Sequence, residues 1–254
     1  MSPGVEIVPV QGLPEIRSGE RLGELIAGAL ASAGEELASI DVLAVAQKAV
    51  SKAEDRVRDL GEVVAGRRAR ELAARLGKDP RLVELILSES RAVVRADRDV
   101  LIVETLSGLI CANAGIDASN VPGADRVTLL PEDPDDSARR IRAEIGAASG
   151  VRPAVLITDS FGRPWRLGQA EVAIGCAGLA PLDDWRGRTD REGRGLAATV
   201  VAIADEVAAA AELVRGKDAG VPSCLVRGLG RLVSDEDGPG ARSIQRPEED
   251  DFFR

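Results

Sequence analysis

Two continuous apolar runs constrain the fold of this chain more than any other feature. Residues 42–46 (VLAVA) and 154–157 (AVLI) carry only apolar side chains, and polar residues follow each run. Runs of this length without polar alternation are typical of strands that are buried on both faces of a sheet. Further short apolar segments, bounded by turn residues, predict strands at residues 5–10, 100–103, 109–112, 127–130, 170–176 and 221–228.

Helical periodicity accounts for most of the remaining sequence. It predicts helices at residues 20–30, 63–76, 80–95, 135–148 and 196–214. The expected helices and strands do not alternate regularly, which predicts an α+β fold with a mixed β-sheet and flanking helices, in one domain or two closely packed subdomains. We assign residues 1–233 to this domain and residues 234–254 to an acidic tail that is either poorly ordered or docked on it.

Neither of the two commonest nucleotide-binding fingerprints is present in the sequence. The chain contains no Gly-x-x-x-x-Gly-Lys-Ser/Thr loop, and no Gly-x-Gly-x-x-Gly follows its first strand. A P-loop or Rossmann fold is therefore disfavoured.

Histidine is absent from the sequence, and acidic residues outnumber basic ones 42 to 33, for a net charge of −9. Histidine triads and histidine-bound zinc are excluded, so any chemistry must use carboxylates, hydroxyls, amides, Lys, Arg and hard cations. The negative charge and the aromatic content of 2% argue against nucleic acid as a partner.

The N-terminus shows no secretory signal, and no apolar run is long enough for a membrane span, so we expect a cytoplasmic protein without a membrane partner. The three cysteines, Cys111, Cys176 and Cys224, are far apart in apolar runs and are predicted to be buried free thiols.

Oxygen-bearing side chains follow two of the predicted strands. Asn113, Asp117, Ser119 and Asn120 follow the strand at 109–112, and Asp159 and Ser160 follow the run at 154–157. Strand ends commonly carry functional side chains, although the first group also fits a simple Asx-rich turn. If Asp117, Asp159 and Ser160 converge, oxygen ligands of this kind suit Mg²⁺ or Mn²⁺, and phosphoryl transfer becomes the leading reaction class.

Basic residues near these segments allow two interpretations each. Lys52 suits contact with phosphate oxygens, or is a solvated lysine at the start of a helix. Arg163 and Arg166 could neutralise a phosphorylated or carboxylated ligand, or could be surface arginines. The acidic turn at residues 132–136 is explained by helix initiation, without a metal.

Several segments together resemble the motifs of coenzyme F-420-0:gamma-glutamyl ligases, and the Asn-Ala-Gly-Ile-Asp-x-Ser-Asn run at residues 113–120 is the most specific of them. The similarity extends to about Gly228. The matching segments are GLP at 12–14, QKAVSKAE at 47–54, ANAGIDASNV at 112–121, LP with DPD at 130–135, TDSFGR at 158–163, AIG at 173–175, GRTD at 187–190 and ADE at 204–206.

The resemblance implies a GTP-dependent ligase that adds L-glutamate to coenzyme F-420-0 and extends a gamma-linked tail. GTP would phosphorylate the acceptor carboxylate, and the glutamate amine would attack the acyl phosphate, releasing GDP and phosphate. The family also implies two divalent cations, Mg²⁺ or Mn²⁺, with K⁺ as a further candidate, and a homodimer. By the same resemblance, this chain would act without a fused reductase domain.

The resemblance also assigns roles to individual residues. Asp117 and Asp159 match ligands of the first cation, and Ser160 stands where a threonine ligand of the second is usual. From their charge and their position after the second acidic segment, and not from the resemblance, Arg163 and Arg166 join the two aspartates as candidate catalytic residues. The positions that match nucleotide contacts are Leu13, Pro14, Glu15, Ile16, Gln47, Lys52, Asn120, Arg215, Gly216, Lys217, Asp218, Ala219, Gly220 and Val221.

One position departs from the family pattern. Lys217 falls where a relative carries a glutamate that ligates a cation, and a protonated lysine cannot be a ligand. Either Asp218 substitutes for it or the second cation is held differently. A metal-dependent phosphohydrolase and a non-catalytic module that binds nucleotide or deazaflavin are the alternative functions. The sequence leaves open the number of glutamates added, the preference for GTP and the exact acceptor acid.

Overall fold

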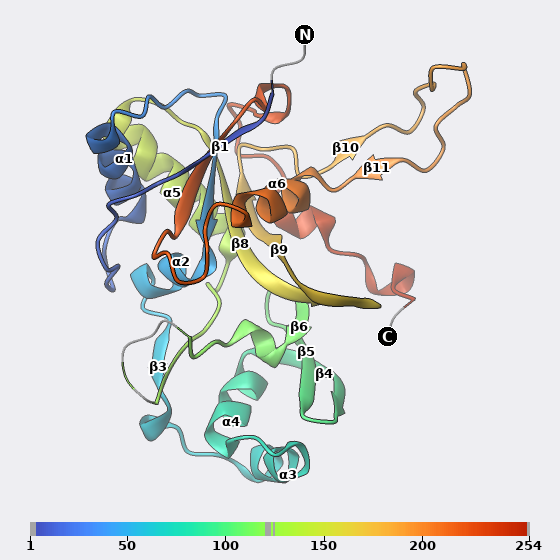
Figure 1. Ribbon diagram of the computed structural model, residues 1–254. Coiled ribbons are helices and arrows are strands. Elements are labelled where there is room, and N and C mark those ends of the chain that lie inside the picture. The colour runs from blue at the N-terminus through green and yellow to red at the C-terminus, as the bar shows by residue number, and fades with distance from the viewer. Residues whose placement is uncertain (1–3, 120–122, 124, 253–254) are drawn as a thin grey trace.

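The computed structural model describes residues 4–119, 123 and 125–252 (Figure 1). Its α-helices are α1 (Leu22–Ala33), α2 (Gln47–Ala53), α3 (Arg67–Leu76), α4 (Pro80–Ser88), α5 (Pro134–Ser149) and α6 (Ile203–Glu212). Its strands are β1 (Glu6–Pro9), β2 (Val42–Ala46), β3 (Val57–Asp59), β4 (Ser90–Asp97), β5 (Val100–Thr105), β6 (Ile110–Ala112), β7 (Arg126–Thr128), β8 (Ala154–Arg163), β9 (Arg166–Ala177), β10 (Asp183–Asp184), β11 (Val200–Val201) and β12 (Ser223–Arg227).

The main sheet has five strands in the order β1-β12-β2-β8-β9. Strands β2 and β8 are parallel and every other neighbouring pair is antiparallel, so the predicted mixed sheet is confirmed. The two apolar runs form the central pair, and residues 42–45 and 154–157 are 0% exposed. Helices α1 and α5 cover one face of this sheet and α6 covers the other, so both faces of the central strands are removed from water.

Residues between β3 and β7 build a second core, in the lower part of Figure 1. The three-stranded sheet β4-β5-β6 packs against α3 and α4 around Leu101, Val103 and Ile86. The hairpin that β5 and β6 form was predicted, and it delivers the segment that contains Asn113 and Asp117.

Three of the predicted helices are shorter than expected. The helix predicted at 63–76 begins only at Arg67, because residues 60–62 form a separate 3-10 turn. The helix predicted at 80–95 ends at Ser88, because residues 90–97 pair with β5 as strand β4, where the β-branched Val93 and Val94 are favoured. The helix predicted at 196–214 begins only at Ile203, because Val200 and Val201 pair with β10. Its small residues pack against the sheet, within the chain's own core.

The predicted helix start at the acidic turn is confirmed, because Asp133 caps α5 by accepting a hydrogen bond from the backbone N–H of Asp136 (3.0 Å). The same helix anchors the segment from Ser234 onward. Asp135 accepts hydrogen bonds from the backbone N–H groups of Ala241 (2.6 Å) and Arg242 (3.2 Å). This acidic segment is therefore docked on the domain.

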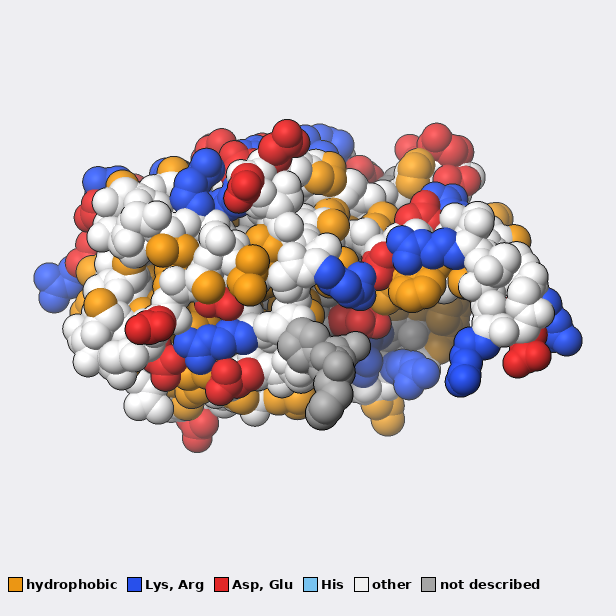
Figure 2. All heavy atoms as spheres, turned by 90° about the horizontal axis from the view of Figure 1, so that it is seen from above, with side chains coloured by type: hydrophobic (Ala, Val, Ile, Leu, Met, Phe, Trp, Pro, Cys, Tyr) orange, Lys and Arg blue, Asp and Glu red, His pale blue; other side chains and the backbone are white. Residues whose placement is uncertain are grey.

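The three cysteines are buried free thiols, as predicted. Burial raises the pKa of Cys111 and Cys176 to about 12, and that of Cys224 to about 11. Among the described helices, none has the length and apolar character needed to cross a membrane. Basic and acidic side chains are interspersed over the face of the molecule that Figure 2 shows.

Two glycines of α1 give a matched test of helix packing. A methyl group at Gly23 would lie 2.5 Å from the Ile141 carbonyl oxygen of α5, whereas one at Gly28 would meet no atom within 4 Å. We expect Gly23→Ala to lower the free energy of unfolding by roughly 1–3 kcal/mol through overpacking. Gly28→Ala, at an exposed helical position, should raise it by roughly 0.5–1 kcal/mol. Urea denaturation of both variants measures the difference, and equal effects would contradict the close α1–α5 contact.

Candidate functional site

Strand β8 carries the second group of predicted site residues. The strand continues beyond the apolar run to Arg163, so Asp159 and Ser160 lie within it and not after its end, as the sequence had suggested. Asp159 is paired with Val172 of β9 and Ser160 with Glu171, and an irregularity in the ladder precedes them, between Ile157 and Thr158. Because successive side chains of a strand point to opposite faces, Asp159 and Ser160 face different surroundings.

Asp159 faces the loop that follows β6. Asp117 lies in that loop, where its backbone exchanges hydrogen bonds with Thr128 of 3.1 and 2.8 Å. Lys48 of α2 places its Nζ 2.7 Å from Asp117 Oδ2 and also donates to the Ser119 hydroxyl. Asp117 and Asp159, 42 positions apart in sequence, are therefore near enough for their charges to interact.

The two carboxyl groups have opposite pKa shifts. Burial raises the pKa of Asp159 to about 7, and the negative charges of Glu171 and Asp117 add to the rise. A hydrogen bond from the Ser160 backbone N–H acts in the opposite direction and lowers it. Burial would also raise the pKa of Asp117, but hydrogen bonds from Lys48 and from Ser119 lower it. The Ser160 N–H and the positive charge of Lys48 compensate the Asp159 carboxylate only in part, which suits a position that receives a cation.

Ser160 faces a cluster of four charged side chains. Its hydroxyl donates to Glu171 Oε1 (2.5 Å) and accepts from Lys217 Nζ (2.5 Å). Lys217 also lies 3.3 Å from Glu171 Oε1 and 3.0 Å from Glu212 Oε1. The buried Arg215 donates from Nη2 to Thr158 Oγ1 (2.9 Å) and to Glu171 Oε2 (3.1 Å). We call Glu171, Glu212, Arg215 and Lys217 the Ser160 cluster.

The pKa values of the Ser160 cluster reflect this pairing. Burial alone would raise the pKa of Glu171, but hydrogen bonds from Ser160 and Thr158 and the charges of Arg215 and Lys217 lower it. Burial would lower the pKa of Lys217, yet the hydrogen bond to Glu212 and the negative charge of Glu171 raise it. Both groups are therefore held in their charged forms.

The segments predicted to contact nucleotide converge around α2. Residues 13–16 connect β1 to α1, and Glu15 forms an ion pair of 2.6 Å with Lys52. Gln47, the first residue of α2, is 1% exposed. The loop at 215–221 precedes β12, which pairs with β2 beside it, and the Ala46 N–H donates to the Pro222 carbonyl (2.7 Å).

Arg163 and Arg166 lie at the far end of the β8–β9 hairpin, and both are exposed. Arg163 Nη2 donates to the Leu167 carbonyl (3.2 Å). Arg163 lies four positions beyond Asp159 in the strand, a span of about 13 Å at the usual rise of a strand. The chain alone therefore does not bring these two arginines to the aspartates. Asn120 lies outside the described residues.

Two residues with prominent contacts were not among the predicted site residues. Lys48 belongs to the Gln47–Glu54 motif, and its spacing of four from Lys52 on a helix was a signal that both could reach one site. Glu171 had no comparable signal, because its position opposite Ser160 depends on where the β8–β9 hairpin turns.

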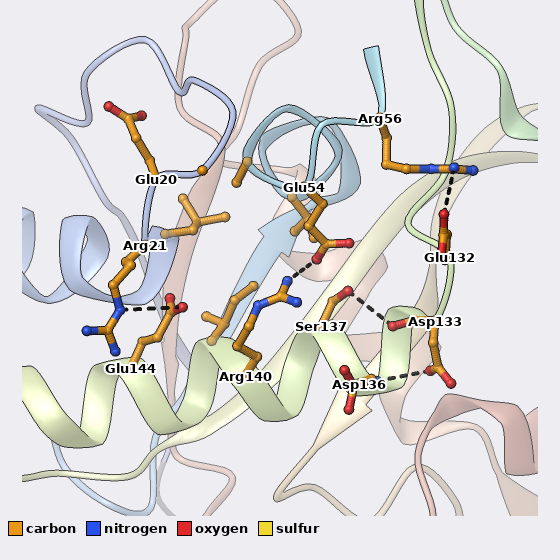
Figure 3. A pocket seen from close by; sticks show the side chains of 15 residues that line it. Glu20, Arg21, Glu54, Arg56, Glu132, Asp133, Asp136, Ser137, Arg140 and Glu144 are labelled. Atoms are coloured by element: carbon orange, nitrogen blue, oxygen red, sulfur yellow. Dashed lines mark hydrogen bonds and ion pairs between the residues drawn. The ribbon is translucent and has the colours of Figure 1, made fainter. Parts of the chain in front are cut away.

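A cavity of about 520 Å³ is lined by α2, by α5 and by the residues at the start of α1 (Figure 3). Its lining is mostly charged, and the charges are paired internally: Arg140 bonds to Glu54, and Arg56 Nη1 lies 3.1 Å from Glu132 Oε1. Of the residues that the structure describes, neither Asp117 nor Asp159 lines this cavity, so we place the candidate site elsewhere, at the aspartates.

The donor atoms at the aspartates suit a hard cation. They are carboxylate, hydroxyl and amide oxygens, although no three acidic, cysteine or histidine side chains among the described residues form a ready metal cluster. Buried Asn113 Oδ1, in the segment after β6, has no hydrogen-bond partner within the described chain, which is unusual for a buried polar atom. A cation completed by ligand and water oxygens fits a site with so few protein donors.

The family model and the similar proteins all point to one family. The sequence model of a family described as F420-0:Gamma-glutamyl ligase matches residues 12–228. A coenzyme F420:L-glutamate ligase from Methanothermobacter thermautotrophicus is 44% identical over 254 residues, covering 99% of both chains. One from Methanopyrus kandleri is 45% identical, covering 99% of this chain and 98% of the relative. One from Methanocaldococcus jannaschii is 40% identical, covering 98% and 97%.

Proposed function

Because this chain belongs to the F420-0:gamma-glutamyl ligase family, we propose that it joins L-glutamate to coenzyme F420-0 through an amide bond, with GTP as the source of free energy. The similarity extends along nearly the whole chain and includes the segments around Asp117 and Asp159. The observation that supports the reaction most directly is the approach of these two aspartates, from separate parts of the sequence, beside Lys48.

The proposed GTP site lies along α2. Lys52 and Gln47 would contact phosphate oxygens, and the residues 13–16 and the loop 215–221 would complete the nucleotide site. The Glu15–Lys52 ion pair would open or be shared on binding, since a triphosphate competes with a carboxylate for the lysine. Asn120 completes the proposed set, by resemblance alone.

Asp117 and Asp159 would hold a divalent cation, Mg²⁺ or Mn²⁺. K⁺ is a candidate for an additional, monovalent ion. When bound, the cation would neutralise charge on the GTP phosphates. Lys48 would move from Asp117 toward a phosphate oxygen, because the cation takes over the neutralisation of that carboxylate. The chain's own part is then to position groups and to stabilise charge, which is what phosphoryl transfer requires.

In the proposed reaction, the acceptor carboxylate attacks the γ-phosphorus of GTP, and the bond to the β-phosphate oxygen breaks to release GDP. The amine of L-glutamate, in its unprotonated form, then attacks the acyl phosphate carbon. The C–O bond to phosphate breaks, and the product amide and phosphate leave. Repetition of both steps on a carboxylate of the product, with a further GTP and a further L-glutamate, would extend a gamma-linked tail.

The decisive assay supplies purified protein with GTP, Mn²⁺ or Mg²⁺, L-glutamate and F420-0, and reads the product by mass. A ligase yields a product heavier by one or more glutamyl residues, and it turns over GTP repeatedly only when glutamate and acceptor are both present. A metal-dependent phosphohydrolase would instead release phosphate without glutamate. A binding module would retain nucleotide or deazaflavin without any turnover.

Lys52→Met tests the proposed nucleotide contact. We expect the KM for GTP to rise roughly 10- to 100-fold, since a hydrogen bond to a charged group contributes about 1.5–3 kcal/mol. The KM for L-glutamate should change little. Steady-state kinetics with each substrate varied in turn measures both constants.

Lys78→Met is the matched control for Lys52→Met, because Lys78 follows α3 in the part of the chain built on the second core. If the KM for GTP rises equally in both variants, or does not rise in Lys52→Met, Lys52 does not contact the nucleotide.

A homodimer is also proposed. The paired strands β10 and β11 carry a long exposed arm, residues 185–199, that extends away from the body of the molecule (Figure 1). Such an arm offers surface for a second copy of the chain. Light scattering of the purified protein distinguishes a dimer from a monomer.

A further inference from the structure

The Ser160 cluster already surrounds a positive charge. The Lys217 ammonium has three N–H donors, and three oxygens lie around it: Ser160 Oγ at 2.5 Å, Glu212 Oε1 at 3.0 Å and Glu171 Oε1 at 3.3 Å. A hydroxyl with two carboxylates is the kind of oxygen set that would otherwise attract a hard cation. The ammonium of Lys217 contacts all three of these oxygens.

The charges of the Ser160 cluster also balance. Two carboxylates, Glu171 and Glu212, face two cations, because Arg215 Nη2 lies 3.1 Å from Glu171 Oε2 and 3.6 Å from Glu212 Oε2. Glu171 and Arg215 are 6% and 4% exposed, so water screens the charges of this pair poorly, while Lys217 lies on the open side of the cluster. A divalent cation at Ser160 would add positive charge to a neutral group and would stand beside an ammonium.

The Ser160 hydroxyl has little capacity left for a cation. It donates its hydrogen to Glu171 and accepts a hydrogen bond from Lys217, which leaves one acceptor position on its oxygen. The residues of this face therefore do not fit the second cation that the sequence resemblance implied, whereas the Asp159 face retains carboxylates without full compensation.

We infer that the Lys217 ammonium takes the place of a second divalent cation at Ser160, so that this chain holds its divalent cation on the Asp159 face alone. Lys217 then acts as a positioning residue that fixes Ser160 and Glu171 through hydrogen bonds. The inference rests on the proposed function, because it takes the cation of the ligase to lie at Asp117 and Asp159.

Metal stoichiometry tests this inference directly. The metal-free full chain is titrated with Mn²⁺, and free Mn²⁺ is read by electron paramagnetic resonance. We expect Lys217→Gln to bind one Mn²⁺ per chain more than the wild type, because it removes the ammonium and leaves both carboxylates. Lys217→Glu, which adds a carboxylate, should bind the additional ion more tightly than Lys217→Gln.

Lys217→Arg is the conservative control, and it should keep the wild-type number of Mn²⁺ ions because it keeps the positive charge. The side chain of Lys217 is 66% exposed, so these substitutions leave the core intact, and a thermal melt of each variant checks this. An unchanged number of bound ions in both Lys217→Gln and Lys217→Glu would overturn the inference.

Asp117→Asn separates this inference from the proposed function. It should remove one Mn²⁺ per chain from both the wild type and Lys217→Gln. If Asp117→Asn leaves the count unchanged while Lys217→Gln still adds an ion, the inference about Lys217 stands and the cation site of the proposed function is wrong.

Discussion

Asp159→Asn should lower turnover of GTP by at least ~100-fold while the protein remains folded. Changes to groups that only support metal ligands typically reduce metal affinity or activity about 10- to 100-fold, and loss of a ligand carboxylate should cost at least as much. Turnover with Mn²⁺, glutamate and F420-0 measures the effect, and equilibrium binding of Mn²⁺ should weaken in parallel.

The same substitution should stabilise the metal-free protein. Burial and the charges of Glu171 and Asp117 raise the pKa of Asp159 to about 7, from 3.8, so the folded state holds a proton that the unfolded chain has already released. The wild-type protein therefore loses stability as the pH rises from about 4 to about 7, and Asn avoids this loss. The gain in stability of Asp159→Asn should be largest above pH 7 and absent near pH 4, as measured by urea denaturation.

The matched control for Asp159→Asn is Asp97→Asn, at a side chain that is 54% exposed at the end of β4. It should leave turnover, Mn²⁺ binding and stability close to those of the wild type. Turnover of Asp159→Asn that matches this control would refute the cation site. If the protein is a ligase or a phosphohydrolase, Asp159→Asn should lose turnover and can still bind nucleotide. If the protein is only a binding module, the wild type itself shows no turnover.

Arg142→Met should produce the largest loss of stability among these variants. Arg142 of α5 is 0% exposed. It donates to the carbonyls of Pro153 (2.9 Å), Asp235 (3.0 Å) and Ser234 (2.6 Å) and to Asp237 Oδ1 (2.7 Å). Methionine fills similar space but leaves these acceptors without their donor, at a cost of about 3–5 kcal/mol.

Thermal and urea denaturation measure this loss. For a chain of this size we expect the melting temperature to fall by roughly 10 °C. Limited proteolysis should cut first after residue 233, because Arg142 fastens the C-terminal segment to α5. Arg67→Met, at a side chain that is 90% exposed on α3, is the control and should melt with the wild type. Similar melting temperatures for the two variants would show that Arg142 does not hold this segment.

The sequence determined those features that depend on local pattern. The runs at 42–46 and 154–157 had to be central strands, because no other element hides a run without polar side chains so completely. The motif of residues 113–120, with the absence of histidine, determined the family and limited the chemistry to oxygen ligands and hard cations.

Only the tertiary structure decided the contacts between distant segments. Residues 90–95 have helical periodicity, yet pairing with β5 made them a strand, because a ladder of hydrogen bonds outweighs weak local propensity. Strand β8 runs past its apolar part, so its alternation directs Asp159 and Ser160 to opposite faces. The oxygen cluster at Lys217 depended on Ser160 and Glu171, which lie 57 and 46 positions from the lysine in sequence, pair with each other across the β8–β9 hairpin and meet the lysine only in the folded chain.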